Sequence, residues 1–430
     1  MKVYLESLGC RLNAAEIEVL ARRFVKAGCD IVNEIEEAEV LVLNTCAVTA
    51  QAVRKSRHRL HTMHRRNPQA HIAALGCWAT EDAKTVSEIP GVTWTLPNAD
   101  KELAIERITG KATDPAIWLP GRCGHTRVFL GVQEGCDSKC TYCITRILRG
   151  PAHSIPLPDV VTSVQNLVAQ GAQEVVLTGV SLGAYGHDLG MQSGLASLVA
   201  AILKETDLPR LRLSSVEPWD VDEPLLQHLS DSRFCRQLHL PLQAGSDSTL
   251  RKMGRTITTQ AFAQLVARAR AISPEVAITT DIITGFPGET ETQFSESLAF
   301  VETMKFAKLH VFPYSEREGT PAIRLPGRIP KSVRKARAKQ MRTLGEKMAI
   351  SYRKRFTGKT LPVLWESQDG DGYWHGLTDT YLQVLAKAEE NLYNRITRTR
   401  LNIVKGKQFL GDIIPDSPEQ PSQNTHALED

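Results

Sequence analysis

Short apolar runs alternate with amphipathic stretches along the first hundred residues. Residues 2–8 have the composition of a short strand, and residues 40–43 and 71–75 are continuous apolar runs, typical of strands buried on both faces. Asn13 and Glu16 form a capping-box-like pair, which predicts a helix start at Asn13. The apolar positions that follow recur at helical spacing and are Ile17, Leu20, Phe24 and Ala27. This alternation predicts a doubly wound α/β domain with a parallel sheet.

A second series of strand and helix patterns begins at Arg127. It follows residues 115–126, whose prolines and glycines predict a linker. The candidate strands are residues 128–133, 174–178, 210–216, 237–240, 276–283 and 307–312. Six such units fit a partial TIM-like (β/α)6 barrel better than a closed eight-stranded one.

The pattern of apolar and polar residues changes in the last hundred residues. Residues 331–355 form a long helical pattern with ten Lys or Arg and a single acidic residue, Glu346. Short β-like runs and turn residues follow Phe356 and end near Ile414, which predicts a small all-β barrel. The predicted domains are therefore 1–114, a linker 115–126, 127–354, 355–415 and a disordered polar tail 416–430.

Composition adds few constraints. The chain has 430 residues, 42% of them hydrophobic and 23% charged, with a net charge of +4, values typical of a globular protein. We expect neither a signal peptide nor a transmembrane helix, and therefore no membrane association and a cytoplasmic, reducing location. In that compartment, the nine cysteines are expected to be metal ligands or buried thiols rather than disulfides.

The most informative segment is Cys136-Asp-Ser-Lys-Cys140-Thr-Tyr-Cys143. Three thiolates at C-x3-C-x2-C spacing can hold three irons of a four-iron cluster and leave the fourth iron open. A zinc knuckle is the alternative, but zinc sites usually pair C-x2-C with a second pair, and none lies nearby. Because the segment directly follows a candidate strand, the cluster is expected at the carboxyl end of the barrel.

This motif, with an aromatic residue before the third cysteine, resembles the radical S-adenosylmethionine (SAM) superfamily. The resemblance implies that the open iron chelates SAM, whose reductive cleavage yields a 5′-deoxyadenosyl radical. It also implies that Tyr142 shields the cluster. The glycine-glycine-glutamate often found after the second barrel strand is replaced here by Thr178-Gly179-Val180-Ser181. Glu217, Gln243 and Ser246 follow later strands and are either cofactor contacts or turn and cap residues.

Cys10, Cys46 and Cys77 each follow an apolar strand. Because the carboxyl ends of parallel strands share one edge of a sheet, these cysteines can converge on a second cluster. The alternative is three buried thiols. Cys29, Cys123 and Cys235 match no motif and are interpreted as structural.

Three segments make the chain similar to the methylthiotransferases of this superfamily. They are Ser-Leu-Gly-Cys-Arg-Leu-Asn (7–13), Leu-His-Leu-Pro-Leu-Gln-Ala-Gly-Ser (238–246) and Gly-Phe-Pro-Gly-Glu-Thr (285–290). The resemblance implies that Cys10, Cys46 and Cys77 hold an auxiliary [4Fe-4S] cluster beside the radical SAM cluster of Cys136, Cys140 and Cys143. It also implies one SAM as methyl donor and another as radical source, a sulfur source, and an electron donor such as flavodoxin or ferredoxin.

Basic and aromatic residues favour an RNA substrate. Residues 51–68 carry six cations and no acid, namely Arg54, Lys55, Arg57, Arg59, Arg65 and Arg66. The 331–355 helix is also basic, although either run alone is more often a solvated helix face. The expected C-terminal barrel carries aromatics suited to stacking on unpaired bases, namely Trp365, Tyr373, Trp374 and Tyr381. This barrel resembles the TRAM RNA-binding domain.

Two further segments, 9–16 and 177–186, resemble the branch of the family that methylthiolates N6-threonylcarbamoyladenosine (t6A) at position 37, beside the tRNA anticodon. The expected function is thus tRNA methylthiotransfer at the anticodon stem-loop. The alternatives are the same chemistry on N6-isopentenyladenosine or on an aspartate of a ribosomal protein, and a non-catalytic iron–sulfur RNA-binding protein.

Overall fold

The computed structural model describes residues 1–112 and 126–415. The chain divides into two units, Met1–Arg353 together with Asp379–Tyr381, and Lys354–Thr378 together with the chain from Leu382 onward. The predicted linker apart from Thr126, the unassigned Cys123 and the predicted tail lie outside the described residues.

The first unit begins with a parallel five-stranded sheet in the order β2-β1-β3-β4-β5. Its strands are β1 (Lys2–Ser7), β2 (Asp30–Ile31), β3 (Val40–Thr45), β4 (His71–Gly76) and β5 (Val92–Leu96). The three strands expected from apolar runs are β1, β3 and β4. The other two lie at the edges of the sheet, where β2 has two residues and β5 is only partly buried, so neither has a continuous apolar run.

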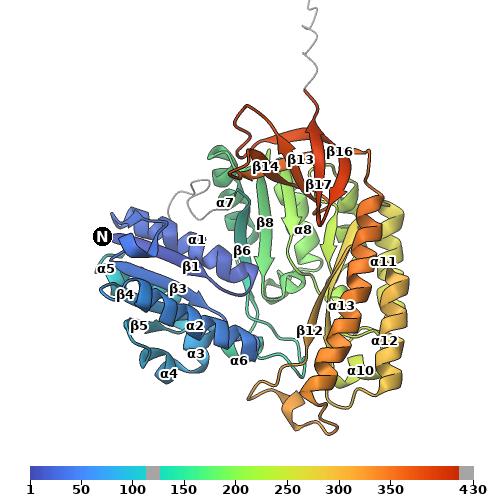
Figure 1. Ribbon diagram of the computed structural model, residues 1–430, viewed down its shortest axis with the longest axis horizontal. Coiled ribbons are helices and arrows are strands. Elements are labelled where there is room, and N and C mark those ends of the chain that lie inside the picture. Colours follow the sequence, from blue (N-terminus) through green and yellow to red (C-terminus); the bar gives the residue numbers. More distant parts are fainter. Residues whose placement is uncertain (113–125, 416–430) are drawn as a thin grey trace, which may run out of the picture. The chain divides into compact units, whose positions relative to one another are not determined.

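Helices cover both faces of this sheet, as Figure 1 shows for α1 on one side and α2 and α3 on the other. They are α1 (Arg11–Lys26), α2 (Ala50–Arg66), α3 (Cys77–Glu81), α4 (Ala83–Ser87) and α5 (Ala104–Thr109). Alternate residues of β3 supply two separate cores, because Val42 packs in one with Phe24 of α1 and Leu43 packs in the other with Leu60 of α2. The doubly wound prediction is confirmed.

The predicted capping box is wrong. Helix α1 begins at Arg11 after Cys10, without a side-chain cap. Asn13 is buried, and its amide donates to the carbonyl oxygens of Leu8 (2.7 Å) and Thr45 (3.0 Å). Its side chain therefore holds two strand ends in place, a tertiary role that sequence spacing does not reveal.

Six parallel strands follow in the first unit. They are β6 (Val128–Glu134), β8 (Glu174–Gly179), β9 (Arg210–Leu213), β10 (Gln237–His239), β11 (Ala277–Thr284) and β12 (Lys308–Pro313). Strands β6, β8 and β9 form one ladder, β10, β11 and β12 form another, and a parallel bridge between Ser215 and His239 connects them. The predicted partial barrel is confirmed. A two-residue strand, β7 (His153–Ser154), pairs antiparallel with β6 and was not predicted.

Helices with apolar inner faces surround these strands. They are α7 (Leu157–Ala169), α8 (Gly194–Glu205), α9 (Glu223–Gln227), α10 (Asp247–Lys252), α11 (Thr259–Ile272), α12 (Glu291–Met304) and α13 (Lys331–Lys354). The short helix α6 (Thr145–Arg149) instead contacts α3 and places Leu148 in a core of the N-terminal sheet. Short 3-10 turns lie at Ile35–Glu37, Asn98–Leu103, Leu182–Ala184, His187–Leu189, Pro218–Asp220, His228–Ser230 and Pro321–Arg324. The strands and helices share one large core, which includes Val164, Phe262 and Val301. Among the described residues, no helix combines the length and apolar character needed to cross a membrane.

The second unit is a closed five-stranded barrel in the order β13-β14-β15-β17-β16. Its strands are β13 (Thr360–Gln368), β14 (Tyr373–Thr378), β15 (Gln383–Lys387), β16 (Ile396–Lys405) and β17 (Gln408–Ile413). The predicted small all-β barrel is confirmed, but two of its aromatics are not available for stacking. Trp365 is fully buried and its indole N–H donates to Thr397, and Trp374 is 6% exposed. These rings fill the barrel because a small barrel needs large interior side chains.

The basic helix α13 presents fewer cations than its sequence suggests. Arg334 is buried and pairs with Glu316 at 2.9 Å, and Arg337 is buried and pairs with Glu289 at 2.7 Å. These two cations are committed to acidic partners inside the unit.

Three residues between β14 and β15, Asp379–Tyr381, belong to the first unit. The carboxylate of Asp379 accepts from Arg236 at 2.6 Å, and its carbonyl accepts from Arg212 at 3.0 Å. The guanidinium of Arg212 also lies 5.1 Å from the ring centre of Tyr381, and it is fully buried beside Glu174. A late segment of the chain thus completes the environment of a buried cation.

Candidate functional site

The loop that carries Cys136, Cys140 and Cys143 follows the carboxyl end of β6. Its path is held by backbone hydrogen bonds from Cys136 to Gly150 (3.1 Å) and from Thr141 to Met253 (2.9 Å). The three cysteines are half-buried and lie close enough for their charges to influence one another. The loop therefore brings three thiols to the carboxyl end of the barrel.

A buried arginine lies beside this loop. The guanidinium of Arg255 lies 3.8 Å from Sγ of Cys140, donates to Glu217 at 2.6 Å and stacks 4.3 Å from the ring centre of Trp219. Burial and the neighbouring Glu217 raise the pKa of Asp220 to about 6. The buried positive charge of Arg255 therefore lies next to Cys140, and the acidic residues Glu217 and Asp220 lie close to that charge.

The four residues expected near the cofactor have different surroundings. Tyr142 packs edge-on against Phe286, with ring centres 6.5 Å apart, and burial raises its pKa. Glu217 is bound to Arg255 next to Cys140. Gln243 adopts φ = 76° in the segment between β10 and α10. Ser246 donates instead to Glu296 of α12 at 2.7 Å, so its hydroxyl is committed to that helix.

Cys10, Cys46 and Cys77 come from three neighbouring strand ends. Cys10 precedes α1, Cys46 directly follows β3, and Cys77 is the first residue of α3 after β4. Because β1, β3 and β4 are adjacent and parallel, their carboxyl ends bring these cysteines together. Besides burial, Cys77 raises the pKa of Cys10, and Cys10 and Cys77 raise the pKa of Cys46. Burial raises the pKa of Cys46 to about 11.

Two glycines permit this convergence. Gly9 has φ = 102°, and a Cβ there would lie 2.6 Å from Sγ of Cys46. Gly76 has φ = 94°, and a Cβ there would lie 2.3 Å from the side-chain oxygen of Asn44. Any side chain at either position would therefore displace the strand ends that carry the thiols.

A second buried arginine connects the two cysteine groups. Arg149 ends α6, the helix that follows Cys143, and donates to Asn13 (2.8 Å), Glu16 (2.8 Å) and Glu134 (2.5 Å). Asn13 in turn accepts a weak hydrogen bond from Cys10 at 3.4 Å. Although burial opposes it, Lys101 and Arg149 hold the pKa of Glu16 at about 2. Arg149 therefore connects the segment that follows Cys143 to α1, the helix that follows Cys10.

The spacing of the thiols suits clusters better than single ions. Zinc bound at about 2.3 Å draws its sulfur ligands to within about 4 Å of one another. Among the described residues, neither cysteine group places three ligand atoms within 4.8 Å of one another, whereas one group of two histidines and an aspartate does. Ligands of a four-iron cluster bind different irons and stand farther apart, and three thiols are the number that leaves one iron of such a cluster open.

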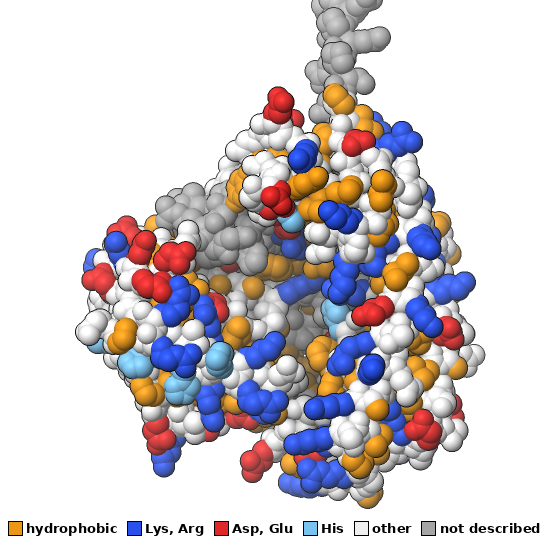
Figure 2. Space-filling view, viewed as in Figure 1, with side chains coloured by type: hydrophobic (Ala, Val, Ile, Leu, Met, Phe, Trp, Pro, Cys, Tyr) orange, Lys and Arg blue, Asp and Glu red, His pale blue; other side chains and the backbone are white. Residues whose placement is uncertain are grey.

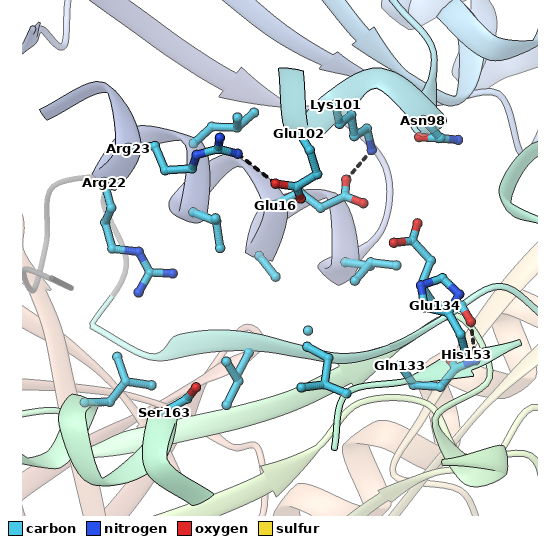
Figure 3. Close-up of a pocket in the computed structure, with 18 of the residues that line it drawn as sticks. Glu16, Arg22, Arg23, Asn98, Lys101, Glu102, Gln133, Glu134, His153 and Ser163 are labelled. Atoms are coloured by element: carbon cyan, nitrogen blue, oxygen red, sulfur yellow. Dashed lines mark hydrogen bonds and ion pairs between the residues drawn. The ribbon is translucent and has the colours of Figure 1, made fainter. Parts of the chain in front are cut away.

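A separate pocket of about 610 Å³ lies between α1 and the strand β6 (Figure 3). Leu12, Leu130 and Ile155 contribute its apolar wall, and four of its charged residues form two ion pairs, Arg23 with Glu102 at 2.7 Å and Lys101 with Glu16. None of the cysteines of the two groups lines this pocket.

The face shown in Figure 2 is hollowed, and Lys and Arg side chains gather around the hollow. On α2, Arg54 and Lys55 are exposed, whereas Arg59 pairs with Glu6 (2.5 Å) and Arg66 pairs with Glu36 (2.6 Å). Part of the predicted basic run therefore remains available to a polyanion.

Sequence reasoning missed three residues of these sites, Asn13, Arg149 and Arg255. The spacing to Glu16 predicts a helix cap at Asn13, and the two arginines lie outside any recognised motif. The only signal was their position, because Asn13 ends the quoted segment 7–13 and Arg149 closely follows the cysteine loop.

Comparisons with known proteins agree with this architecture. Residues 2–96 match the family described as "Uncharacterized protein family UPF0004", and residues 130–301 match the radical SAM superfamily. Among solved structures, the radical SAM methyltransferase TsrM from Kitasatospora setae, determined with cobalamin and a [4Fe-4S] cluster, has a TM-score of 0.54 and 16% identity. That match covers 75% of this chain and 76% of TsrM. At this identity, the likeness shows the fold alone.

Curated relatives match nearly the whole chain. The threonylcarbamoyladenosine tRNA methylthiotransferase MtaB of Bacillus subtilis (strain 168) is 30% identical over 93% of this chain and 93% of its own length. The protein of the same name from Thermotoga maritima is 34% identical, over 89% and 90%. The tRNA-2-methylthio-N(6)-dimethylallyladenosine synthase of Geobacillus kaustophilus is 31% identical, over 97% and 83%. With this identity over both chains, and with a radical SAM domain and two cysteine groups, this protein belongs to the radical SAM methylthiotransferase family.

Proposed function

We propose that the protein replaces the hydrogen on carbon 2 of N6-threonylcarbamoyladenosine, at position 37 of tRNA, with a methylthio group. The observation that carries the chemistry is the convergence of two cysteine groups in one unit, joined through Arg149. The substrate rests on the relatives named for threonylcarbamoyladenosine, which are 30–34% identical over 84–95% of the chain.

Cys136, Cys140 and Cys143 hold the radical SAM cluster in this proposal. When bound, that cluster supplies the electron that cleaves SAM into methionine and the 5′-deoxyadenosyl radical. Arg255 places a positive charge beside Cys140, which stabilises negative charge on the thiolate. Tyr142 and Phe286 exclude water from one side of the loop. Glu217 and Gln243 remain our candidates for polar contacts with SAM.

Cys10, Cys46 and Cys77 hold an auxiliary cluster in this proposal. Such a cluster would supply a binding position for the sulfur that is to be methylated and transferred, with one SAM as methyl donor and a second as radical source. The hydrogen removed from carbon 2 leaves with 5′-deoxyadenosine. Asn13 orients Cys10, and Arg149 offsets the negative charge of the thiolates.

The domains divide this work. Residues 1–114 carry the auxiliary site, 127–354 the radical site, and 355–415 an RNA-binding barrel that engages the anticodon stem-loop. The reaction also needs an electron donor of the flavodoxin or ferredoxin class and a sulfur source, and its substrate places the enzyme in the cytoplasm.

Nucleoside analysis tests the proposal. The gene is deleted in its host, and the strain is complemented with the wild-type chain, Cys140→Ala, Cys46→Ala or the matched control Cys29→Ala. Cys29 is buried outside both groups. Mass spectrometry of total tRNA nucleosides should show loss of the 2-methylthio product, accumulation of its precursor, and restoration by the wild type and Cys29→Ala alone.

Two results would contradict this assignment. An unchanged nucleoside profile in the deletion strain would redirect the search to another modified adenosine or to a ribosomal protein. Full restoration by Cys46→Ala would remove the auxiliary site from the proposal.

A further inference from the structure

A polar group lies in the barrel apart from both cysteine groups. It consists of His239 on β10, Asp281 on β11 and His310 on β12. The Oδ1 atom of Asp281 lies 3.3 Å from Nε2 of His239 and 3.2 Å from Nδ1 of His310. Among the described residues, no other histidines, cysteines or acids bring three ligand atoms so close together.

This group lies on the face of the sheet opposite its main core. Ile278 and Ile282 of β11 and Val311 of β12 pack in or against that core. Successive side chains of a strand point to opposite faces, so Asp281 and His310, which pair in the register of β11 and β12, point the other way. The side chain of Asp281 is 25% exposed and that of His310 is 40% exposed. They are therefore accessible from the concave side of the barrel.

The hydrogen bonds of this group leave two acceptors unused. An ionised carboxylate can only accept, so both imidazole nitrogens donate to Asp281. Although burial opposes it, the two histidines hold the pKa of Asp281 well below its usual range, so the carboxylate stays ionised. In the described part of the chain, Oδ2 of Asp281 and Nε2 of His310 have no hydrogen-bond partner, whereas Nδ1 of His239 faces the hydroxyl of Thr279 at 2.8 Å.

Two more exposed side chains extend the same face of β12. Phe312 is 43% exposed and lies nearer the carboxyl end, where the cysteine loop lies. Lys308 lies at the other end, exposed and without an ion pair among the residues described. Alternate residues of a strand are about 6.6 Å apart, so an aromatic ring, an acceptor pair and a cation follow one another in a row.

We propose that this row binds the N6-threonylcarbamoyl substituent of the substrate adenosine. Phe312 contacts the purine, His310 and Asp281 accept hydrogen bonds from the carbamoyl N–H and threonyl hydroxyl groups, and Lys308 pairs with the threonyl carboxylate. A dimethylallyl substituent offers none of these tail groups, so it would leave the acceptors unpaired. This inference rests on the proposed function and assigns the residues that recognise its substrate.

Binding measurements with the cluster-loaded protein test the row. The probes are anticodon stem-loop RNAs that differ only at position 37, where one carries t6A and the other unmodified adenosine. The variants are Lys308→Met and His310→Ala, with Lys204→Met as the matched control, because Lys204 is an exposed lysine of α8. We expect the wild type and Lys204→Met to prefer the t6A RNA by about 10-fold or more, and the other two variants to lose that preference.

Affinity for the unmodified RNA separates recognition from misfolding. It should stay within about two-fold of the wild type in each variant, because general phosphate contacts supply most of it. An unchanged t6A preference in both Lys308→Met and His310→Ala, or no preference in the wild type, overturns the inference.

The same three ligand atoms could instead hold a divalent ion. Stoichiometric zinc in the wild type that disappears in Asp281→Asn overturns the inference in favour of a metal site. If the wild type prefers the t6A RNA but does not methylthiolate it, the proposed function fails and the binding row stands.

Discussion

The three cysteines of the first group stand in one loop, Cys136–Cys143, whereas Cys10, Cys46 and Cys77 come from the ends of three strands. The loop needs a few backbone hydrogen bonds to place its thiols. The second group needs the register of β1, β3 and β4 and two glycines with positive φ. Each group nevertheless has a buried arginine held by a glutamate, Arg255 with Glu217 and Arg149 with Glu16. The same chemical environment is thus built locally in one case and by the whole sheet in the other.

Cysteine substitutions should give the largest difference between the two groups in 5′-deoxyadenosine formation and methylthiolation. We expect Cys140→Ala to abolish 5′-deoxyadenosine formation, and Cys77→Ala to abolish methylthiolation while some SAM cleavage persists. The reason is that only the first group is proposed to bind the SAM that is cleaved. Chromatography of 5′-deoxyadenosine alongside nucleoside analysis measures both. Equal loss of 5′-deoxyadenosine in the two variants would contradict the division of roles.

Glycine substitutions should affect only the dispersed group. Gly9→Ala places a Cβ against Cys46, so the iron content of the reconstituted protein should fall from about eight to about four per chain. Gly110→Ala is the control, because its φ is also positive but nothing lies within 4 Å of the added Cβ. Iron analysis and electron paramagnetic resonance report the result. Full iron content in Gly9→Ala would show that the strand ends can adjust.

The two arginines allow a matched test of charge and geometry. Arg149→Lys keeps the charge but cannot reach Asn13, Glu16 and Glu134 together, so product formation should fall by about 10-fold with SAM cleavage retained. Arg255→Lys should instead lower SAM cleavage by about 10-fold. Single-turnover assays of both products distinguish the two. If either variant lowered SAM cleavage and product formation equally, the separate roles of Arg149 and Arg255 would be contradicted.

The smallest expected effect concerns Glu18 on α1, the helix that follows Cys10. Burial raises its pKa to about 8. The folded protein therefore keeps a proton that the unfolded chain loses above about pH 4.3, so stability falls as pH rises toward 8. Glu18→Gln should remove this dependence and stabilise the protein at pH 8.5 by about 1 kcal/mol or more, with little change at pH 5. Thermal unfolding at both pH values measures it, and equal shifts would contradict the raised pKa.

Sequence patterns predicted the buried strands well, because β3, β4 and β8 carry continuous apolar runs. They missed β2, β5 and β7, whose few residues or partial exposure leave no pattern. Cysteine positions were informative because strand ends and short spacing are both visible in sequence. The hydrogen bond between Asn13 and Arg149 was not visible, because the two residues lie 136 positions apart in the sequence. The prediction that Trp365 and Trp374 stack on bases was wrong, because composition does not show which side of a barrel a ring faces.

The placement of Asp379–Tyr381 in the first unit has a consequence for synthesis on the ribosome. Arg212 and Arg236 are translated long before Asp379, the residue that supplies their carbonyl and carboxylate acceptors. Until residue 379 has been synthesised, Arg212 keeps its ion pair with Glu174 but lacks the carbonyl acceptor of Asp379. A chain truncated at Arg353 would permanently lack the acceptors that Asp379 supplies to Arg212 and Arg236.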